Sequence, residues 1–330
     1  MSVLKRFLGL ASVALLCALG PSASAATHAT RAVMTVVPDG DSSGLYSEKG
    51  AATCMACHNT APVTDILHTP HAVKGDPNSP FGQHDCESCH GPSNAHATGF
   101  MHGKPTPPAI RFTGPNASPV EERNKVCLGC HQDATRMNWL GSAHQNANLA
   151  CTSCHTIHVA KDPILVRATQ VDKCFSCHTQ QRAESYEYSH HPIREGKTIC
   201  SDCHNPHGSA GPSLLKEFTV NETCYDCHTE KRGPMLWEHQ PVRENCLNCH
   251  TPHGSNEARL MKERMNFMCS SCHSAVSNNS GGAFGGAHSF PGNLEAAATF
   301  NSALANNRTC LNCHSQIHGS NDPNGAYFFR

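Results

Sequence analysis

The arrangement of the cysteines constrains this chain more than any other feature. Of its 21 cysteines, 20 lie in the pattern Cys-x-x-Cys-His, which occurs ten times, and Cys17 alone stands outside it. Zinc sites also use Cys-x-x-Cys pairs, but zinc gives no reason for a His to follow the second Cys every time. An oxidising compartment favours disulfides, yet a disulfide network would not keep every Cys in one motif. The motif therefore serves another kind of site.

Two thiols three positions apart match the two vinyl groups of haem, and the adjoining His then reaches the iron as proximal ligand. The pattern predicts ten covalently attached haem c groups. The predicted thioether residues are Cys54, Cys57, Cys86, Cys89, Cys127, Cys130, Cys151, Cys154, Cys174, Cys177, Cys200, Cys203, Cys224, Cys227, Cys246, Cys249, Cys269, Cys272, Cys310 and Cys313. The predicted proximal ligands are His58, His90, His131, His155, His178, His204, His228, His250, His273 and His314.

The other 15 histidines decide what the haems do, because ten haems need ten distal ligands. A His follows each odd-numbered motif after about 11 to 15 residues. Four even-numbered motifs have one three or four residues on, and the second motif has one slightly later. The predicted distal ligands are His71, His96, His144, His158, His190 or His191, His207, His239, His253, His288 and His318. None of the nine Met residues occupies a repeated position, so we expect bis-histidine ligation and low reduction potentials throughout.

Two choices among the distal ligands stay open. His190 aligns with His239 in the repeated text His-x-Pro-[Ile/Val]-Arg-Glu, whereas His191 matches the 13-residue spacing of His144. His71 shares that spacing and is preferred to His68. A His three residues after a proximal ligand cannot easily reach the opposite face of its own haem. We expect such residues to bind a neighbouring iron, but the sequence does not assign the crossed pairs.

Two motifs and two distal histidines form a repeat that is used five times. Repeats of this length are typical of arrays in which each unit contacts its neighbours. The expected dihaem units span about 51–110, 111–165, 166–215, 216–258 and 259–330, and together form a decahaem domain over 51–330. The predicted fold is a multihaem cytochrome c, mostly coil with a few short α-helices, built as an elongated haem wire. One helix is expected to lead into Cys127 from a capping box at Ser118 with Pro119 at its first position, and another to span 293–305. Glycines at 281–286 predict a loop.

Residues 1–25 are typical of a secretory signal peptide. Lys5 and Arg6 precede an apolar run from Phe7 to about Gly20, and an Ala-x-Ala cleavage pattern ends at Ala25. The run is too short to span a bilayer. Residues 26–50 then form a lead-in without motifs. Charged residues make up only 15% of the chain and show no basic patch, which argues against nucleic acid as a partner.

A catalytic haem must offer an open or exchangeable coordination position, and the count of histidines leaves none. The sequence therefore predicts an electron carrier and not an enzyme. A multihaem reductase would require one distal His to be absent from its site. No motif has the Cys-x-x-Cys-Lys form used at the active haem of pentahaem nitrite reductases.

The ten motifs, the export signal, the chain length and the Pro-His-Gly text around His207 and His253 resemble the MtrA/DmsE-type periplasmic decahaem cytochromes. The resemblance covers Cys54 to His318 and implies an extended haem wire inserted into an outer-membrane β-barrel porin. It also implies a periplasmic cytochrome donor and an extracellular multihaem cytochrome or terminal reductase as partners, in anaerobic respiration or electron uptake. The alternatives are a soluble periplasmic shuttle to a terminal reductase and a cytochrome that polymerises into a filament.

Overall fold

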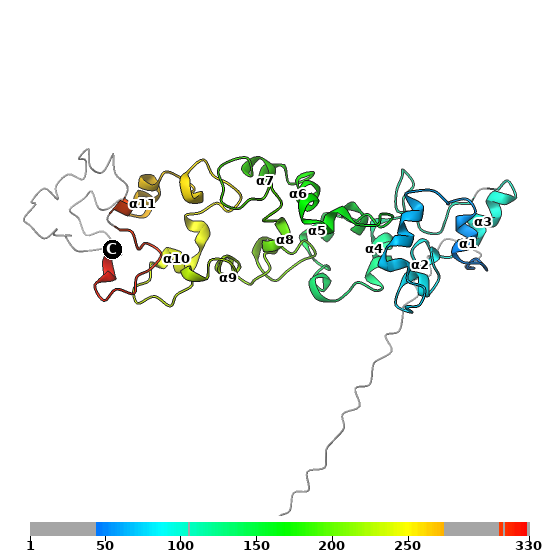
Figure 1. Ribbon diagram of the computed structural model, residues 1–330, viewed down its shortest axis with the longest axis horizontal. Helices are drawn as coiled ribbons and strands as arrows, with labels where there is room; N and C mark the ends of the chain where they lie inside the picture. Colours follow the sequence, from blue (N-terminus) through cyan, green and yellow to red (C-terminus); the bar gives the residue numbers. More distant parts are fainter. Residues whose placement is uncertain (1–43, 105, 274–309, 313, 329–330) are drawn as a thin grey trace, which may run out of the picture. The chain divides into compact units, whose positions relative to one another are not determined.

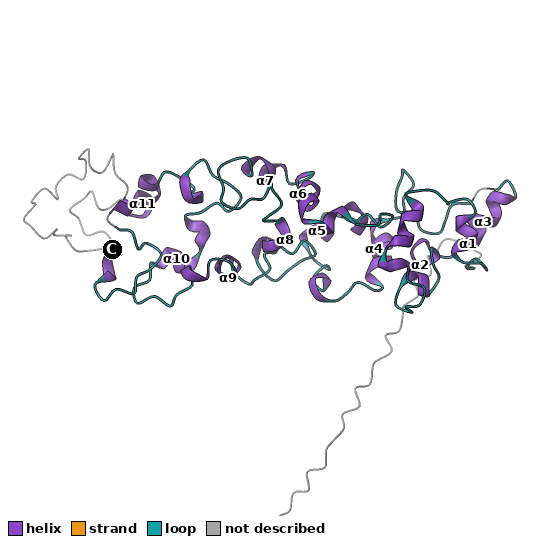
Figure 2. Cartoon of the chain, in the orientation of Figure 1, coloured by secondary structure: helices purple, strands orange, loops and turns teal. Residues whose placement is uncertain are grey.

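The computed structural model describes residues 44–104, 106–273, 310–312 and 314–328, which all belong to one unit of the chain, Val36–Arg330. Short helices separated by loops make up these residues (Figures 1 and 2). The helices are α1 Ala51–Met55, α2 Glu87–His90, α3 Asn94–Met101, α4 Val120–Leu128, α5 Ala143–Asn146, α6 Arg167–Phe175, α7 Thr179–Glu184, α8 Cys200–Cys203, α9 Val220–Tyr225, α10 Gln240–Glu244 and α11 Met265–His273. Within the described residues, strand pairing is limited to isolated bridges. None of the helices in this part of the chain combines the length and the apolar composition of a membrane span. The prediction of a mostly coiled chain with a few short helices is confirmed.

The motifs alternate between two local settings. The first Cys of each odd-numbered motif lies in one of the helices α1, α4, α6, α9 and α11, whereas the even-numbered motifs form single turns. These turns are α2, α8 and the 3-10 segments η5 Cys151–Ser153, η9 Cys246–Asn248 and η13 Cys310–Asn312. In nine motifs the backbone N–H of the His donates to the carbonyl of the first Cys at 2.9–3.1 Å. In the first eight motifs, whose residues are all described, both thiols and the imidazole therefore project from one helical turn.

Buried asparagines fasten the two motifs of a unit together. Asn124 in α4 donates from Nδ2 to the carbonyl of Leu149 at 3.0 Å and accepts from the Cys151 N–H at 2.8 Å. In α9, Asn221 repeats this arrangement and accepts from the Cys246 N–H at 2.7 Å. Each amide satisfies backbone groups next to an even-numbered motif, so it fixes that motif against the preceding helix.

Helix α4 forms where the sequence predicts a helix, but it begins differently. Its N-cap is Pro119, with no side-chain cap, and Val120 is its first residue. The Ser118 hydroxyl is occupied elsewhere, because Oγ accepts from the Arg111 N–H at 3.1 Å. The predicted capping box is therefore wrong. The predicted helix over 293–305 and the glycine loop at 281–286 lie outside the described residues.

The last residues of the lead-in are anchored to the second motif. Ser47 donates from its backbone N–H at 3.0 Å and from its hydroxyl at 2.7 Å to Oε2 of Glu87. Glu87 also accepts from the Ser93 N–H at 2.8 Å and is only 3% exposed. These donors compensate the burial of the carboxylate.

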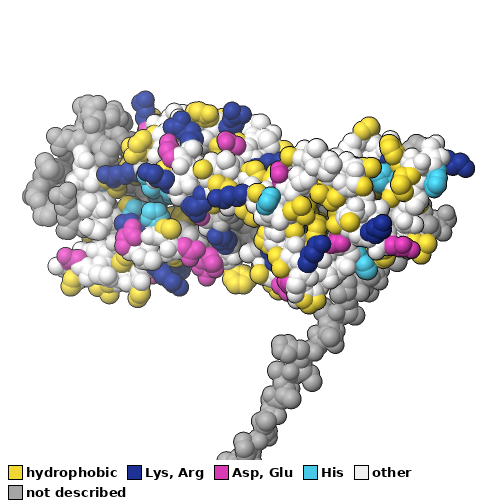
Figure 3. Space-filling model, turned by 45° about the vertical axis from the view of Figure 1, so that its right-hand side comes forward, with side chains coloured by type: hydrophobic (Ala, Val, Ile, Leu, Met, Phe, Trp, Pro, Cys, Tyr) yellow, Lys and Arg dark blue, Asp and Glu magenta, His cyan; other side chains and the backbone are white. Residues whose placement is uncertain are grey.

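The polypeptide encloses only small apolar clusters. One centres on Ala51, Ile66 and Phe81, and another contains Val171 with two neighbours. Other large apolar side chains stay open to solvent, including Leu140, which is 75% exposed. Figure 3 shows apolar side chains spread over the face in view. The described chain therefore lacks the single enclosed core that a protein of this length normally builds.

Candidate haem sites

Histidine rings face each other in pairs across the described units. In the first eight motifs, the proximal candidate opposes a distal candidate with ring centroids 6.0–6.3 Å apart. A metal–imidazole bond is about 2 Å long, so two such bonds plus the radii of both rings account for this separation. The pairs are His58–His96, His90–His158, His131–His71, His155–His207, His178–His144, His204–His253, His228 with His190 or His191, and His250–His318.

Hydrogen bonding at Nδ1 leaves Nε2 of several of these rings available. Nδ1 contacts a main-chain carbonyl, which can only accept, so Nδ1 carries the proton and the lone pair of Nε2 remains free. This applies to His90, His96, His144, His191, His204 and His250. Metal-binding histidines generally donate their second ring N–H in this way. The tautomer therefore fits ligation through Nε2.

Burial keeps several of the rings in the neutral form that metals bind. It lowers the pKa of His71, His90, His204 and His207 below the usual value. The same effect lowers the pKa of His318 to about 4. An imidazole that resists protonation remains a ligand over a wide range of pH.

Most pairs join neighbouring units. The His that closely follows the fourth, sixth, eighth or tenth motif faces the even-numbered motif one unit earlier. The more distant His after the first, third or fifth motif faces the odd-numbered motif one unit later. Within the described residues, His96 and His58 are the pair that lies inside one unit. The rings thus cross the unit boundaries in both directions. The sequence leads us to expect crossing only for the His that closely follows an even-numbered motif, and it does not give the partners.

Glycine allows the close approach on which the crossed pairs depend. Gly208 follows His207 with φ +111°, and a Cβ there would strike the carbonyl of Asn138 in the preceding unit. Gly254 follows His253 with φ +155° and lies equally close to the carbonyl of Glu184. Because only glycine lacks this Cβ, Gly208 and Gly254 let their units pack against the ones before them. The adjacent His is thereby brought over a neighbouring motif.

The structure bears on both open choices. His71, and not His68, faces His131. His190 and His191 both face His228, at 6.0 and 6.3 Å. The two differ at Nδ1, because His191 contacts the carbonyl of Pro252 at 2.8 Å, as His144 contacts the equivalent carbonyl of Pro206 at 2.7 Å. His288 lies outside the described residues, and His239 lies against Phe328 with ring centroids 5.5 Å apart.

Thiols of consecutive motifs lie in contact. The first Cys of each odd-numbered motif contacts the first Cys of the next motif, and this holds in all five units. The hydrogen bond from Cys174 lowers the pKa of Cys200 to about 7, and that from Cys224 does the same to Cys246. Between units the second thiols approach each other, as Cys89 does Cys130. Along the described motifs, contacts between first cysteines therefore alternate with contacts between second cysteines.

Buried polar atoms add to the fit. Nε of Arg123 and Nε of Arg136 are buried and have no hydrogen-bond partner in the described chain. A guanidinium in this state suits an anionic group such as a haem carboxylate. Together with paired thiols, facing neutral imidazoles and exposed apolar side chains, these atoms fit haem at the motifs.

Sequence reasoning missed several residues that shape these sites. Asn124 and Asn221 each stand three positions before the first Cys of a motif, and Asn266 has the same place in the sequence. Aligning the repeats on that Cys would have revealed them. Asp162, which contacts His155, has no such repeat signal.

Comparisons with known proteins agree with this chemistry. The model of the doubled CXXCH motif matches residues 190–233 and 239–278, and the model of the NrfB-like cytochrome c-type protein matches residues 86–171. The multiheme cytochrome MtrA of Shewanella baltica is 43% identical over 87% of this chain and 83% of its own length. The cytochrome c-type protein NrfB of Haemophilus influenzae is 32% identical over 37% of this chain and 55% of its own length.

Proposed function

The chain belongs to the MtrA-type multihaem c-type cytochromes, and on that premise we propose that it conducts electrons through ten bis-histidine haems within a porin–cytochrome conduit. It is an electron-transfer protein that attaches haem c through its Cys-x-x-Cys-His motifs. Each haem, when bound, supplies a one-electron couple at its iron. The number ten and the conduit are the parts that we propose.

The proposed axial ligands follow from the facing rings. We assign each proximal His the distal partner that it faces in the first eight motifs, with His191 in preference to His190. If the more distant His after the seventh motif likewise faces the odd-numbered motif one unit later, His239 belongs to the ninth motif. His288 is then left for the tenth. Under this assignment every iron is held by two imidazoles. No position then remains for a substrate, which favours an electron carrier over a reductase.

The observation that carries the proposal is the crossing of rings between units. A unit that supplies a ligand to its neighbour cannot separate from it without opening a site. The contacts between thiols also bring consecutive attachment points close together. The chain's own residues therefore hold the sites in sequence order, as a path for stepwise electron transfer requires.

The cellular setting rests on the resemblance of the motifs and their flanking text. We propose a periplasmic protein, exported by residues 1–25 and associated with the outer membrane. Its partners would be an outer-membrane β-barrel porin, a periplasmic cytochrome donor and an extracellular multihaem cytochrome or terminal reductase. In this role it would serve extracellular respiration or electron uptake.

Affinity purification of the tagged full chain from solubilised outer membranes tests this proposal. We expect a β-barrel protein to co-purify, and the intact mass of the haem-stained band to equal residues 26–330 plus ten haems. A soluble periplasmic cytochrome without family resemblance, tagged in the same way, is the control. Isolation as a soluble monomer without a barrel would favour the shuttle, and haem-stacked fibres would favour the filament. Carbon monoxide binding by the reduced wild type would favour a reductase.

A further inference from the structure

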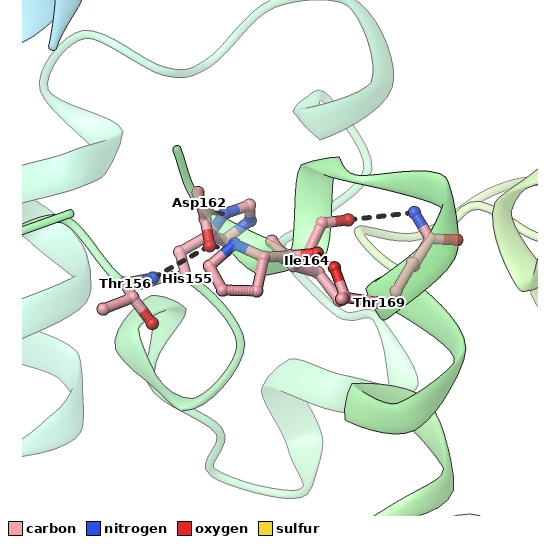
Figure 4. Close-up of polar contacts among 7 residues, drawn as sticks. His155, Thr156, Asp162, Ile164 and Thr169 are labelled. Carbon is pink, nitrogen blue, oxygen red and sulfur yellow. Dashed lines mark hydrogen bonds and ion pairs between the residues drawn. The ribbon is translucent and has the colours of Figure 1, made fainter. Parts of the chain in front are cut away.

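His155 makes a contact unlike those of the other even-numbered motifs. Its Nδ1 lies 2.7 Å from Oδ2 of Asp162, so the ring donates to a carboxylate (Figure 4). The other Asp162 oxygen accepts from the backbone N–H of Thr156 at 3.2 Å and of Ile164 at 3.3 Å. The side chain of Asp162 is only 12% exposed. The carboxylate is thus held in place independently of the histidine.

The four equivalent rings donate to main-chain carbonyls instead. Nδ1 of each lies 2.6–3.2 Å from a carbonyl oxygen, in the pairs His90–Ile110, His204–Ser213, His250–Arg259 and His314–Tyr327. A carbonyl is a neutral acceptor, whereas a carboxylate is an anion that draws the proton more strongly. Asp162 therefore distinguishes the fourth motif chemically from the second, sixth, eighth and tenth.

A local change in the backbone accounts for the exchange of acceptor. Ser213 and Arg259, whose carbonyls accept, have left-handed φ of 52° and 61°. Ile164 stands at the matching place in its turn, η6 Pro163–Leu165, and does not have positive φ. A β-branched residue strongly disfavours the left-handed region. Its carbonyl instead accepts from Gln170 at 3.0 Å, so Asp162 takes over the contact with His155.

We propose that Asp162 sets the reduction potential of the fourth haem and makes it the last of the even-numbered haems to be reduced. The inference rests on the proposed function, in which His155 is an axial ligand. A carboxylate that accepts from Nδ1 gives the imidazole partial imidazolate character and makes Nε2 a stronger donor. Stronger donation stabilises ferric over ferrous iron, so the potential falls.

Two weaker contacts of the same kind set the scale. In one, Nδ1 of His228, the proximal candidate of the seventh motif, lies 3.7 Å from Oε1 of Glu230, whose side chain is 58% exposed. Glu184 Oε2 lies 3.2 Å from Nδ1 of His253, the proposed distal ligand of the sixth haem. Its side chain is 31% exposed, so solvent screens it more than it screens Asp162. The sixth haem should therefore show the same effect to a smaller extent. Arg136 lies near His207, on the other side of the fourth site. It is present in both the wild type and the Asp162 variants, so its charge does not account for a difference between them.

Potentiometric titration of the purified ten-haem protein tests the proposal, with D162N as the variant. In D162N, one haem in ten should titrate at a higher potential than in the wild type. At a given applied potential, its ratio of reduced to oxidised iron should rise at least tenfold, which corresponds to a shift of about 59 mV for a one-electron couple. D162E, which keeps the charge, should restore much of the original curve. E257Q is the matched control, because Glu257 aligns with Asp162 but pairs with Arg264 at 3.7 Å. Superimposable curves for D162N and E257Q would overturn the proposal.

Electron paramagnetic resonance of the oxidised wild type keeps the test decisive even if D162N does not mature. One low-spin ferric centre should have the narrower spread of g values that imidazolate character produces. Ten centres that all lack this narrower spread would also overturn the proposal. Intact mass distinguishes a failure of the proposed function from a failure of the role of Asp162. A wild type with fewer than ten haems contradicts the proposed function. Ten haems with no response to D162N contradict only the role of Asp162.

Discussion

At the scale of the residue, two imidazoles per site determine what the protein can do. His71 and His68 lie three positions apart, but only His71 faces a proximal candidate, His131. We predict that His71→Ala opens one iron and creates a single carbon monoxide-binding haem, detected by the difference spectrum of the reduced protein. His68→Ala is the matched control and should bind none. Carbon monoxide binding by the His68 variant, or its absence in the His71 variant, would contradict the assignment.

The residues of the sites were predictable from the sequence to different degrees. The motif cysteines and histidines follow directly from their spacing, because attachment to one haem requires a local arrangement. The facing partners do not, since distance along the chain does not tell which neighbouring unit folds back over a given motif. Asp162 escaped notice because its contact depends on the backbone of Ile164, which the motif pattern does not record.

At the scale of the element, close packing between units depends on glycine. We predict that Gly208→Ala displaces His207 from His155, because the new Cβ would strike the carbonyl of Asn138. The variant should unfold at lower temperature and bind carbon monoxide at the fourth site. Gly141 provides the control, because it has φ +83° and open space around it, so Gly141→Ala meets only the backbone cost of about 1–2 kcal/mol. If both variants lowered the unfolding temperature equally and Gly208→Ala bound no carbon monoxide, this role of Gly208 would be contradicted.

The helices illustrate where local sequence rules stop. The helix before Cys127 was predicted from a capping box and a proline at its start, and it forms at that place. The capping box itself does not form, because Ser118 instead binds the backbone of Arg111, seven residues earlier. Asn124 likewise spans 27 residues to reach Cys151. Contacts of this range are set by tertiary packing and not by the local pattern.

At the scale of the whole molecule, the haems must supply the core that the polypeptide lacks. The described apolar clusters contain three buried residues each, and many large apolar side chains are exposed. We predict that the chain expressed without haem attachment is unfolded, as expected when a bound group provides the stabilising contacts. Far-ultraviolet circular dichroism of the apoprotein checks this. A native-like spectrum would show that the polypeptide folds alone.

Conduction of electrons without catalysis requires every iron in the molecule to be held by two imidazoles. Near-infrared magnetic circular dichroism of the oxidised protein measures this most directly, because the position of the charge-transfer band reports the axial ligands and its intensity counts them. We predict ten bis-histidine equivalents per chain and no other band. A high-spin band, a histidine–methionine band, or an intensity clearly below ten equivalents would contradict the account.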